Sequence, residues 1–268
     1  MKKFLLFALL AGSSAGAMAQ TAPPADDPSA PDGPRSRWGL GVGAAASDSP
    51  YAGEGMRVRP IPLISYHGEK FFFEGITAGW QFIESDSFEL AAIAKLRLDG
   101  FDIDDLGRRE LASNGLDYRR LEDRDDSLDA GITAKWSGMA GELEIELLAD
   151  VTDTSGGQEI AIQYGYPMQW GRTLVTPNVG VTWLSKDMAN YYYGTLDEEV
   201  ARGIVDYKPD AVAIPHVGVS VMRILGDRWS MLAFLKYSVL PDEIKDSPFV
   251  EPDTDGSASI LIGVQRSF

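Results

Sequence analysis

The stretch GELEIELLAD, residues 141–150, alternates acidic and apolar side chains along its length. Its even positions, broken only by Leu148, carry Glu142, Glu144, Glu146 and Asp150. Its odd positions carry Leu143, Ile145, Leu147 and Ala149. A period of two residues is typical of a β-strand with one wet and one dry face. In a soluble sheet the acids would face solvent, whereas in a membrane barrel they would face a polar lumen and the leucines would face lipid.

The same alternation recurs along the chain from residue 35 onward. It is regular in residues 36–47, 87–99, 127–137, 157–170 and 172–185, and it persists with more interruptions in 211–225, 228–240 and 257–268. These segments match the ~9–11 residues that a tilted membrane strand needs, together with its ends. Strands of soluble proteins average about half that length. Segment length therefore favours a transmembrane barrel.

The connections between these segments are of two kinds. Short ones fall at Ser85-Asp86, at Gly138-Met139, around Gly171 and at Gly226-Asp227. Longer polar ones comprise residues 100–126, 186–210 and 241–256. Outer-membrane barrels have short turns on the periplasmic side and longer loops outside the cell. The alternation of short and long connections predicts the same arrangement here.

Aromatic residues provide an independent indication. If the short turns are periplasmic, eight aromatics lie at the periplasmic ends of strands, on or beside the outward face: Trp38, Tyr66, Phe82, Phe88, Trp136, Trp170, Trp229 and Phe268. Such a girdle marks a membrane interface. The alternative, a soluble β-sandwich, gives no reason for aromatics to share one level. We therefore predict an all-β fold, a transmembrane antiparallel β-barrel.

The number of strands depends on residues 69–83, EKFFFEGITAGWQFI. Phe71 and Phe73 share a parity that Ile76 and Trp80 do not, so the phase of the alternation changes near Gly75. A bulge or a turn there would explain the change. Single-chain bacterial barrels have even strand numbers. A turn at Gly75 gives twelve strands, our prediction, and ten is the alternative.

The N-terminal residues predict export. Residues 1–19, MKKFLLFALLAGSSAGAMA, combine two lysines, an apolar run and a small-residue ending, which is the pattern of a signal peptide. Residues 20–34 contain five prolines and no large apolar side chain, which predicts a disordered leader. The barrel is expected to occupy residues 35–268 and to lie in the cell outer membrane, surrounded by lipid and lipopolysaccharide.

Charged residues on the inward face are the candidate functional residues. They comprise Arg57, Arg59, Lys135, Glu142, Glu144 and Glu146. Charges away from water need partners, and Lys135 is expected to lie nearly opposite Glu142 across the 138–139 hairpin. Two interpretations remain open. The residues could form a structural network that narrows the pore, or a selectivity ring for a permeating solute.

No pattern in the chain predicts an enzyme, a metal site or a cofactor site. The chain has two histidines, His67 and His216, and no cysteine, and it lacks a Gly-x-Ser-x-Gly elbow. The acidic stretches DIDD (102–105) and DRDD (123–126) lack the spacing of a calcium loop and read as solvated loops. The formal net charge of −16 argues against a nucleic-acid partner.

The N-terminal third resembles a known family. Residues 40–75 contain a Gly-rich strand, a Ser-Pro-Tyr-x-Gly loop, an Arg-Pro-x-Pro strand and a Gly-x-x-Phe-Phe hairpin. The matching residues are Ser49, Pro50, Tyr51, Gly53, Arg59, Pro60, Pro62, Tyr66, Gly68, Phe71 and Phe72. This pattern is similar to that of the MltA-interacting protein (MipA)/OmpV family of outer-membrane proteins. In that family Tyr follows Pro after a spacer, which is missing here.

The resemblance implies a non-enzymatic barrel that acts as a scaffold linking a peptidoglycan synthase to a lytic transglycosylase at the outer membrane. Cell-wall enzymes would then be its partners. A small-solute channel and a surface adhesin or antigen are the alternatives. An adhesin would act through loops 100–126 and 186–210, where NYYYG (190–194) is expected to expose aromatic side chains.

Overall fold

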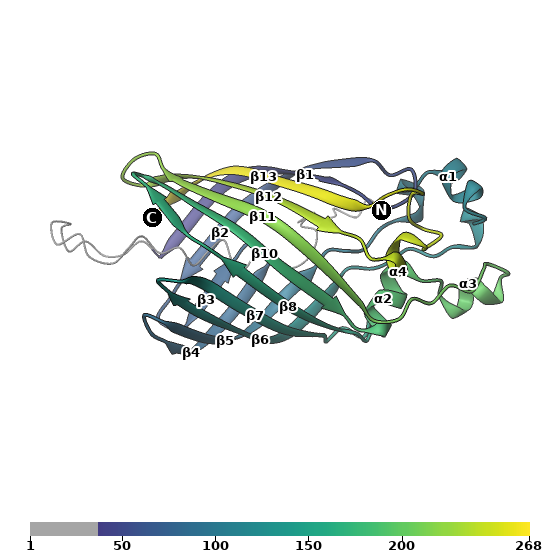
Figure 1. Ribbon diagram of the computed structural model, residues 1–268, viewed down its shortest axis with the longest axis horizontal. Helices are drawn as coiled ribbons and strands as arrows, with labels where there is room; N and C mark the ends of the chain where they lie inside the picture. The colour runs from purple at the N-terminus through teal and green to yellow at the C-terminus, as the bar shows by residue number, and fades with distance from the viewer. Residues whose placement is uncertain (1–36) are drawn as a thin grey trace, which may run out of the picture.

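Antiparallel pairing closes the sheet on itself in the computed structural model, which describes residues 37–268 (Figure 1). The strands are β1 (Trp38–Asp48), β2 (Met56–His67), β3 (Phe71–Glu74), β4 (Thr77–Glu84), β5 (Phe88–Arg97), β6 (Ser127–Gly138), β7 (Gly141–Asp150), β8 (Gln158–Gly165), β9 (Met168–Trp170), β10 (Thr173–Leu184), β11 (Val212–Ile224), β12 (Trp229–Val239) and β13 (Gly256–Ser267). The predicted signal peptide and leader lie outside the described residues.

The thirteen segments make twelve barrel strands. Apart from β8 and β9, successive strands pair antiparallel, and β1 also pairs with β13. β8 and β9 pair with successive parts of β10, so together they form one strand, interrupted where Pro167 cannot donate to the ladder. The predicted twelve-stranded barrel is confirmed, and the ten-stranded alternative is wrong.

The phase change near Gly75 is a turn. Gly75 has a φ of 58°, a conformation that glycine adopts without strain, and β3 and β4 pair directly across it, with Phe71 opposite Trp80. Phe71 and Trp80 therefore both face outward, although their sequence parity differs.

The acidic face of β7 points into the lumen. Glu146 is buried, whereas Leu143 and Leu147 on the other face are exposed on the outside of the barrel. The predicted girdle lies at the end with the short turns, where Trp38 contacts Tyr66 and Phe88 contacts Trp136. Both ends of the barrel sheet, Trp38 and Phe268, are also at this end, which is the periplasmic one in outer-membrane barrels.

Strand β2 has an unpaired edge. The β3–β4 hairpin is short, so the ladder with β3 covers only Ser65–His67, while the ladder with β1 covers Met56–Tyr66. The Gly75 amide donates to the Ile64 carbonyl, so even-numbered residues of β2 direct their backbone groups toward this edge. Pro60 and Pro62 are even-numbered and have no N–H. They therefore remove two donors from the edge, as proline does on edge strands.

The extracellular end carries a folded cap, which we define as residues 49–55, 98–126, 185–211 and 240–255. It contains η2 (Ile103–Asp105), α1 (Arg108–Ser113), η3 (Tyr118–Arg120), α2 (Lys186–Tyr193), α3 (Asp197–Ala201) and α4 (Asp242–Lys245). All these short helices gather at one end of the barrel (Figure 1). No helix within residues 37–268 is both long and apolar enough to cross a bilayer.

Candidate functional site

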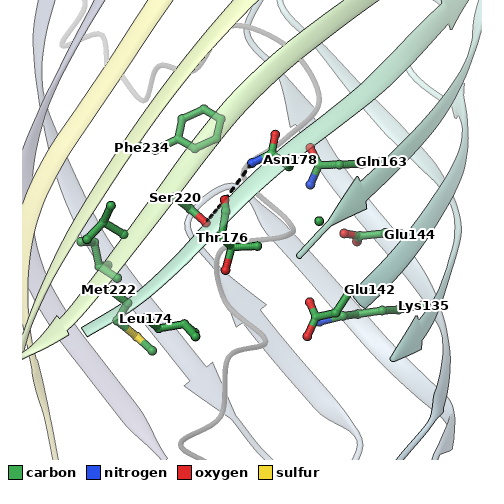
Figure 2. A pocket seen from close by; sticks show the side chains of 13 residues that line it. Lys135, Glu142, Glu144, Gln163, Leu174, Thr176, Asn178, Ser220, Met222 and Phe234 are labelled. Atoms are coloured by element: carbon green, nitrogen blue, oxygen red, sulfur yellow. Dashed lines mark hydrogen bonds and ion pairs between the residues drawn. The ribbon is translucent and has the colours of Figure 1, made fainter. Parts of the chain in front are cut away.

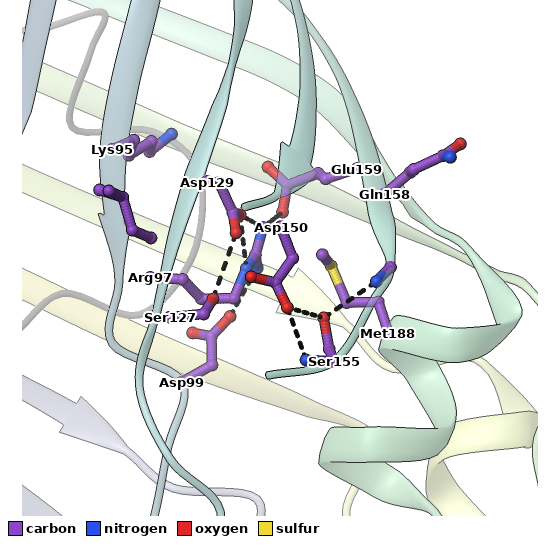
Figure 3. Close-up of polar contacts among 12 residues, drawn as sticks. Lys95, Arg97, Asp99, Ser127, Asp129, Asp150, Ser155, Gln158, Glu159 and Met188 are labelled. Atoms are coloured by element: carbon purple, nitrogen blue, oxygen red, sulfur yellow. Dashed lines mark hydrogen bonds and ion pairs between the residues drawn. The ribbon is translucent and has the colours of Figure 1, made fainter. Parts of the chain in front are cut away.

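The lumen below the cap holds a cluster of charges around Arg97. The Arg97 guanidinium donates to Asp129 (Nε to Oδ2, 2.8 Å), to Glu159 (Nη2 to Oε2, 2.6 Å) and to Asp99 (Nη1 to Oδ2, 2.8 Å). These residues come from β5, β6, β8 and the loop after β5, and they converge inside the barrel (Figure 3). One arginine thus ties three strands and one loop together along one wall of the upper lumen.

A second ion pair lies one step further from the cap. Lys95 and Glu146 are both buried, and Lys95 Nζ is 2.9 Å from Glu146 Oε2. Lys95 and Arg97 occupy alternate positions of β5, so they share its inward face. The two clusters therefore form a continuous charged layer, which we call the ion-pair layer and define as Lys95, Arg97, Asp129, Glu146 and Glu159.

A third ion pair lies toward the periplasmic end. Lys135 Nζ is 3.0 Å from Glu142 Oε2, although the residue directly opposite Lys135 in the ladder is Glu144. The Lys135–Glu142 contact is thus diagonal across the hairpin. The Glu144 carboxylate accepts a 3.4 Å hydrogen bond from Thr133 Oγ1, and none of the ion pairs within residues 37–268 includes it.

The remaining two predicted residues lie elsewhere. Arg57 and Arg59 are at the extracellular end of β2, where Arg57 pairs with Glu54 of the cap. The six predicted residues are therefore distributed over three places and do not form one ring. The sequence prediction omitted Lys95, Arg97, Asp129 and Glu159, although their parity marks them as inward-facing. That parity was the signal that could have identified them.

A pocket occupies the lumen between the ion-pair layer and the periplasmic turns. It encloses about 640 Å³, including the solvent at its mouth. Polar residues from β6, β7, β8 and β10 form one wall, among them Glu144, Gln163 and Asn178. Apolar residues from β11 and β12, including Met222 and Phe234, face them across the lumen (Figure 2). The pocket is therefore amphipathic.

The cap is organised around one buried arginine. Arg124, which is 2% exposed, pairs with Glu199 through two hydrogen bonds of 2.9 and 3.0 Å. Its remaining N–H groups donate to backbone carbonyls of Glu122, Tyr191 and Gly194. All five donors of the guanidinium are thus satisfied. The pair joins residues 98–126 to residues 185–211, so the two longest loops are held as one unit.

The structure corrects two expectations about these loops. The stretch DRDD was expected to be a solvated acidic loop, and its acids do remain at the surface, but its arginine is buried. The stretch NYYYG was expected to expose its aromatics, but Tyr192 is only 1% exposed and Tyr193 packs against the apolar core of the cap. These tyrosines face inward because the two loops share that core.

Comparisons with known proteins agree with this architecture. Residues 40–268 match the family model described as MltA-interacting protein MipA. The putative outer membrane protein YiaT of Escherichia coli K12 is 31% identical over 87% of this chain and 92% of its own. The MltA-interacting protein of Escherichia coli K12 is 31% identical over 83% of this chain and 88% of its own.

A solved structure resembles the chain in fold alone. The COG4313 outer membrane channel from Pseudomonas putida F1 aligns with a TM-score of 0.45 at 11% identity, covering 88% of this chain and 96% of the channel.

Proposed function

Because the chain belongs to the MltA-interacting protein (MipA) family and forms an outer-membrane barrel, we propose that it is a non-enzymatic scaffold for cell-wall enzymes on the periplasmic side. One relative at 31% identity carries a name that describes interaction with MltA.

The observation that carries the proposal is the closure of the lumen at its extracellular half. The cap covers the outer end with two apolar clusters, which include Leu111, Phe249 and Ile244 at 0% exposure. Below it, the ion-pair layer on β5, β6, β7 and β8 and the inward side chains of the facing strands fill the lumen, because Lys95, His216 and Lys236 are only 4–7% exposed. A barrel with two successive obstructions is poorly suited to passing solutes, and better suited to presenting a surface.

The periplasmic end offers such a surface. Met139 at the β6–β7 turn is fully exposed, and Leu225 at the β11–β12 turn is half exposed. Both side chains lie outside the lipid-facing band, where they are available to a protein partner, and methionine is enriched in the cores of protein–protein interfaces. These turns are the part of the described chain nearest to the cell wall.

A pull-down from detergent extracts tests the proposal. Tagged wild-type protein should enrich a lytic transglycosylase or a peptidoglycan synthase, and Met139→Asp with Leu225→Asp should reduce that enrichment. Val205→Asp is the matched control, because Val205 is also exposed and apolar but lies in the cap. Absence of any cell-wall enzyme from the wild-type eluate, with a folded barrel verified by heat-modifiable migration, would contradict the scaffold role.

A further inference from the structure

The lumen pocket has more hydrogen-bond acceptors than its own residues use. Lys135 is the one lysine or arginine on its wall, and it pairs with Glu142, which leaves the Glu144 carboxylate of the same wall without an ion pair among residues 37–268. Asn178 is only 7% exposed, and its amide oxygen has no hydrogen-bond partner in the described chain. A buried acceptor that lacks a donor carries a free-energy cost.

The opposite wall has a different character. Met222, Leu232 and Phe234 line it, and Figure 2 shows Met222 and Phe234 across the lumen from the polar residues. A site with a few convergent polar groups and an apolar wall is the usual form of a small-molecule pocket.

We propose that this pocket binds small primary amines that carry an apolar body. The ammonium group would donate to Glu144 and to the amide oxygen of Asn178, and the body would contact Leu232 and Phe234. An ammonium has three donors and no acceptor, so it complements a wall on which acceptors are in excess. An anion would face two glutamates. A neutral alcohol would leave the Glu144 carboxylate uncompensated.

The ligand would enter from the periplasmic side. The pocket lies beside the periplasmic ends of β6, β7, β10 and β11, whereas the ion-pair layer and the cap separate it from the extracellular end. This inference is independent of the scaffold role, because one depends on the lumen and the other on the turn tips.

Site-directed thiol labelling tests the charge preference of the pocket. The chain has no cysteine, so Ser220→Cys on the pocket wall is a unique thiol. In detergent, a cationic methanethiosulfonate should modify it faster than an anionic one, by about tenfold after correction for their rates with a free thiol. Glu144→Gln should remove most of this preference. Glu89→Gln is the matched control, because Glu89 also faces the lumen from the periplasmic half but does not line the pocket.

Protection from labelling tests binding itself. 2-Phenylethylamine should slow modification of the Ser220→Cys thiol in a saturable manner, and the effect should be lost with Glu144→Gln and retained with Glu89→Gln. 2-Phenylethanol, which has the same body without the charge, should protect at least tenfold more weakly. Equal protection by the two compounds, no protection by the amine, or a thiol that neither reagent reaches would each overturn the proposal. A pull-down result would be unaffected by any of these outcomes.

Discussion

Lys135 pairs with the Glu142 carboxylate diagonally across the hairpin, and it lies directly opposite Glu144 in the ladder. Lys135→Met should lower the unfolding temperature, since it leaves Glu142, like Glu144 beside it, without an ion-pair partner. Loss of one partner of a fully buried pair costs about 3–5 kcal/mol, and the cost here should be smaller because the Glu142 side chain is 26% exposed. Thermal unfolding in detergent measures the effect.

A second substitution separates the charge effect from the loss of packing. Lys135→Met combined with Glu142→Leu should recover part of the lost stability, because one of the two unpaired carboxylates is gone. Recovery should be incomplete, since Glu144 remains. If the double variant were as unstable as the single one, the contribution of Lys135 would be packing rather than charge.

Arg124 is the residue on which the cap most depends. Arg124→Lys keeps the charge but has three donors in place of five, so at least two of the five acceptors around it would lose their donors. We expect faster hydrogen exchange and faster proteolysis within residues 98–126 and 185–211. Arg108→Lys serves as the control, because Arg108 forms an exposed pair with Asp104. Equal protection of the cap in both variants would contradict this role.

For single residues, the sequence predicted which face of a strand a side chain occupies better than which residue that side chain contacts. Parity placed Glu142, Glu144 and Lys135 on the inward face, because side-chain direction in a strand follows position alone. It could not identify the diagonal Lys135–Glu142 contact, since strand stagger and side-chain reach decide which of two carboxylates a lysine meets. The Arg124–Glu199 pair joins residues 75 positions apart, and no local pattern marks it.

Among the elements, β2 is the one with an open edge. Pro60→Val together with Pro62→Val would restore two N–H groups that point toward this edge. Edges with unpaired donors and acceptors associate with other strands, so the double variant should form dimers or larger assemblies in detergent. Light scattering coupled to size-exclusion chromatography measures the change. Ala44→Val with Val42→Ala on the neighbouring, fully paired β1 is the control. A monomeric double variant would show that the prolines do not protect the edge.

The cap should become more stable on mild acidification. Partial burial, followed by the nearby Asp123 and Asp105 carboxylates, raises the pKa of Asp102 above its usual value. A carboxyl group with a raised pKa in the folded state binds its proton more tightly when folded. The folded cap therefore gains stability as pH falls from neutral toward about 4, the ordinary pKa of aspartate. Hydrogen exchange of residues 98–126, corrected for intrinsic rates, should slow over this range. Faster exchange at lower pH would contradict the predicted stabilisation of the cap.

The barrel strands were predictable as elements and the cap was not. Long segments with a period of two, such as 87–99 and 127–137, carry a repeated signal that survives local irregularities. The cap helices are mostly four to eight residues long, too short for a helical period to emerge. They form because apolar residues from separate loops share one core, and that information is distributed along the chain.

In the whole molecule, three features lie at successive levels along the barrel axis. Charged residues near the cap hold neighbouring strands together, the amphipathic pocket lies beneath them, and the exposed turn tips lie at the periplasmic end. Most solute-passing barrels need an aqueous path through every level. Here the path is interrupted at two levels, which is why the scaffold role and the pocket both depend on the periplasmic side.

Closure of the lumen is tested most directly by conductance in planar bilayers. Purified wild-type protein, verified as folded by heat-modifiable migration and shown to insert by protease protection, should produce no sustained conductance steps. This result is expected because the cap and the ion-pair layer obstruct the lumen in series. Sustained, reproducible steps from the wild-type protein would contradict closure and would favour a small-solute channel over a scaffold.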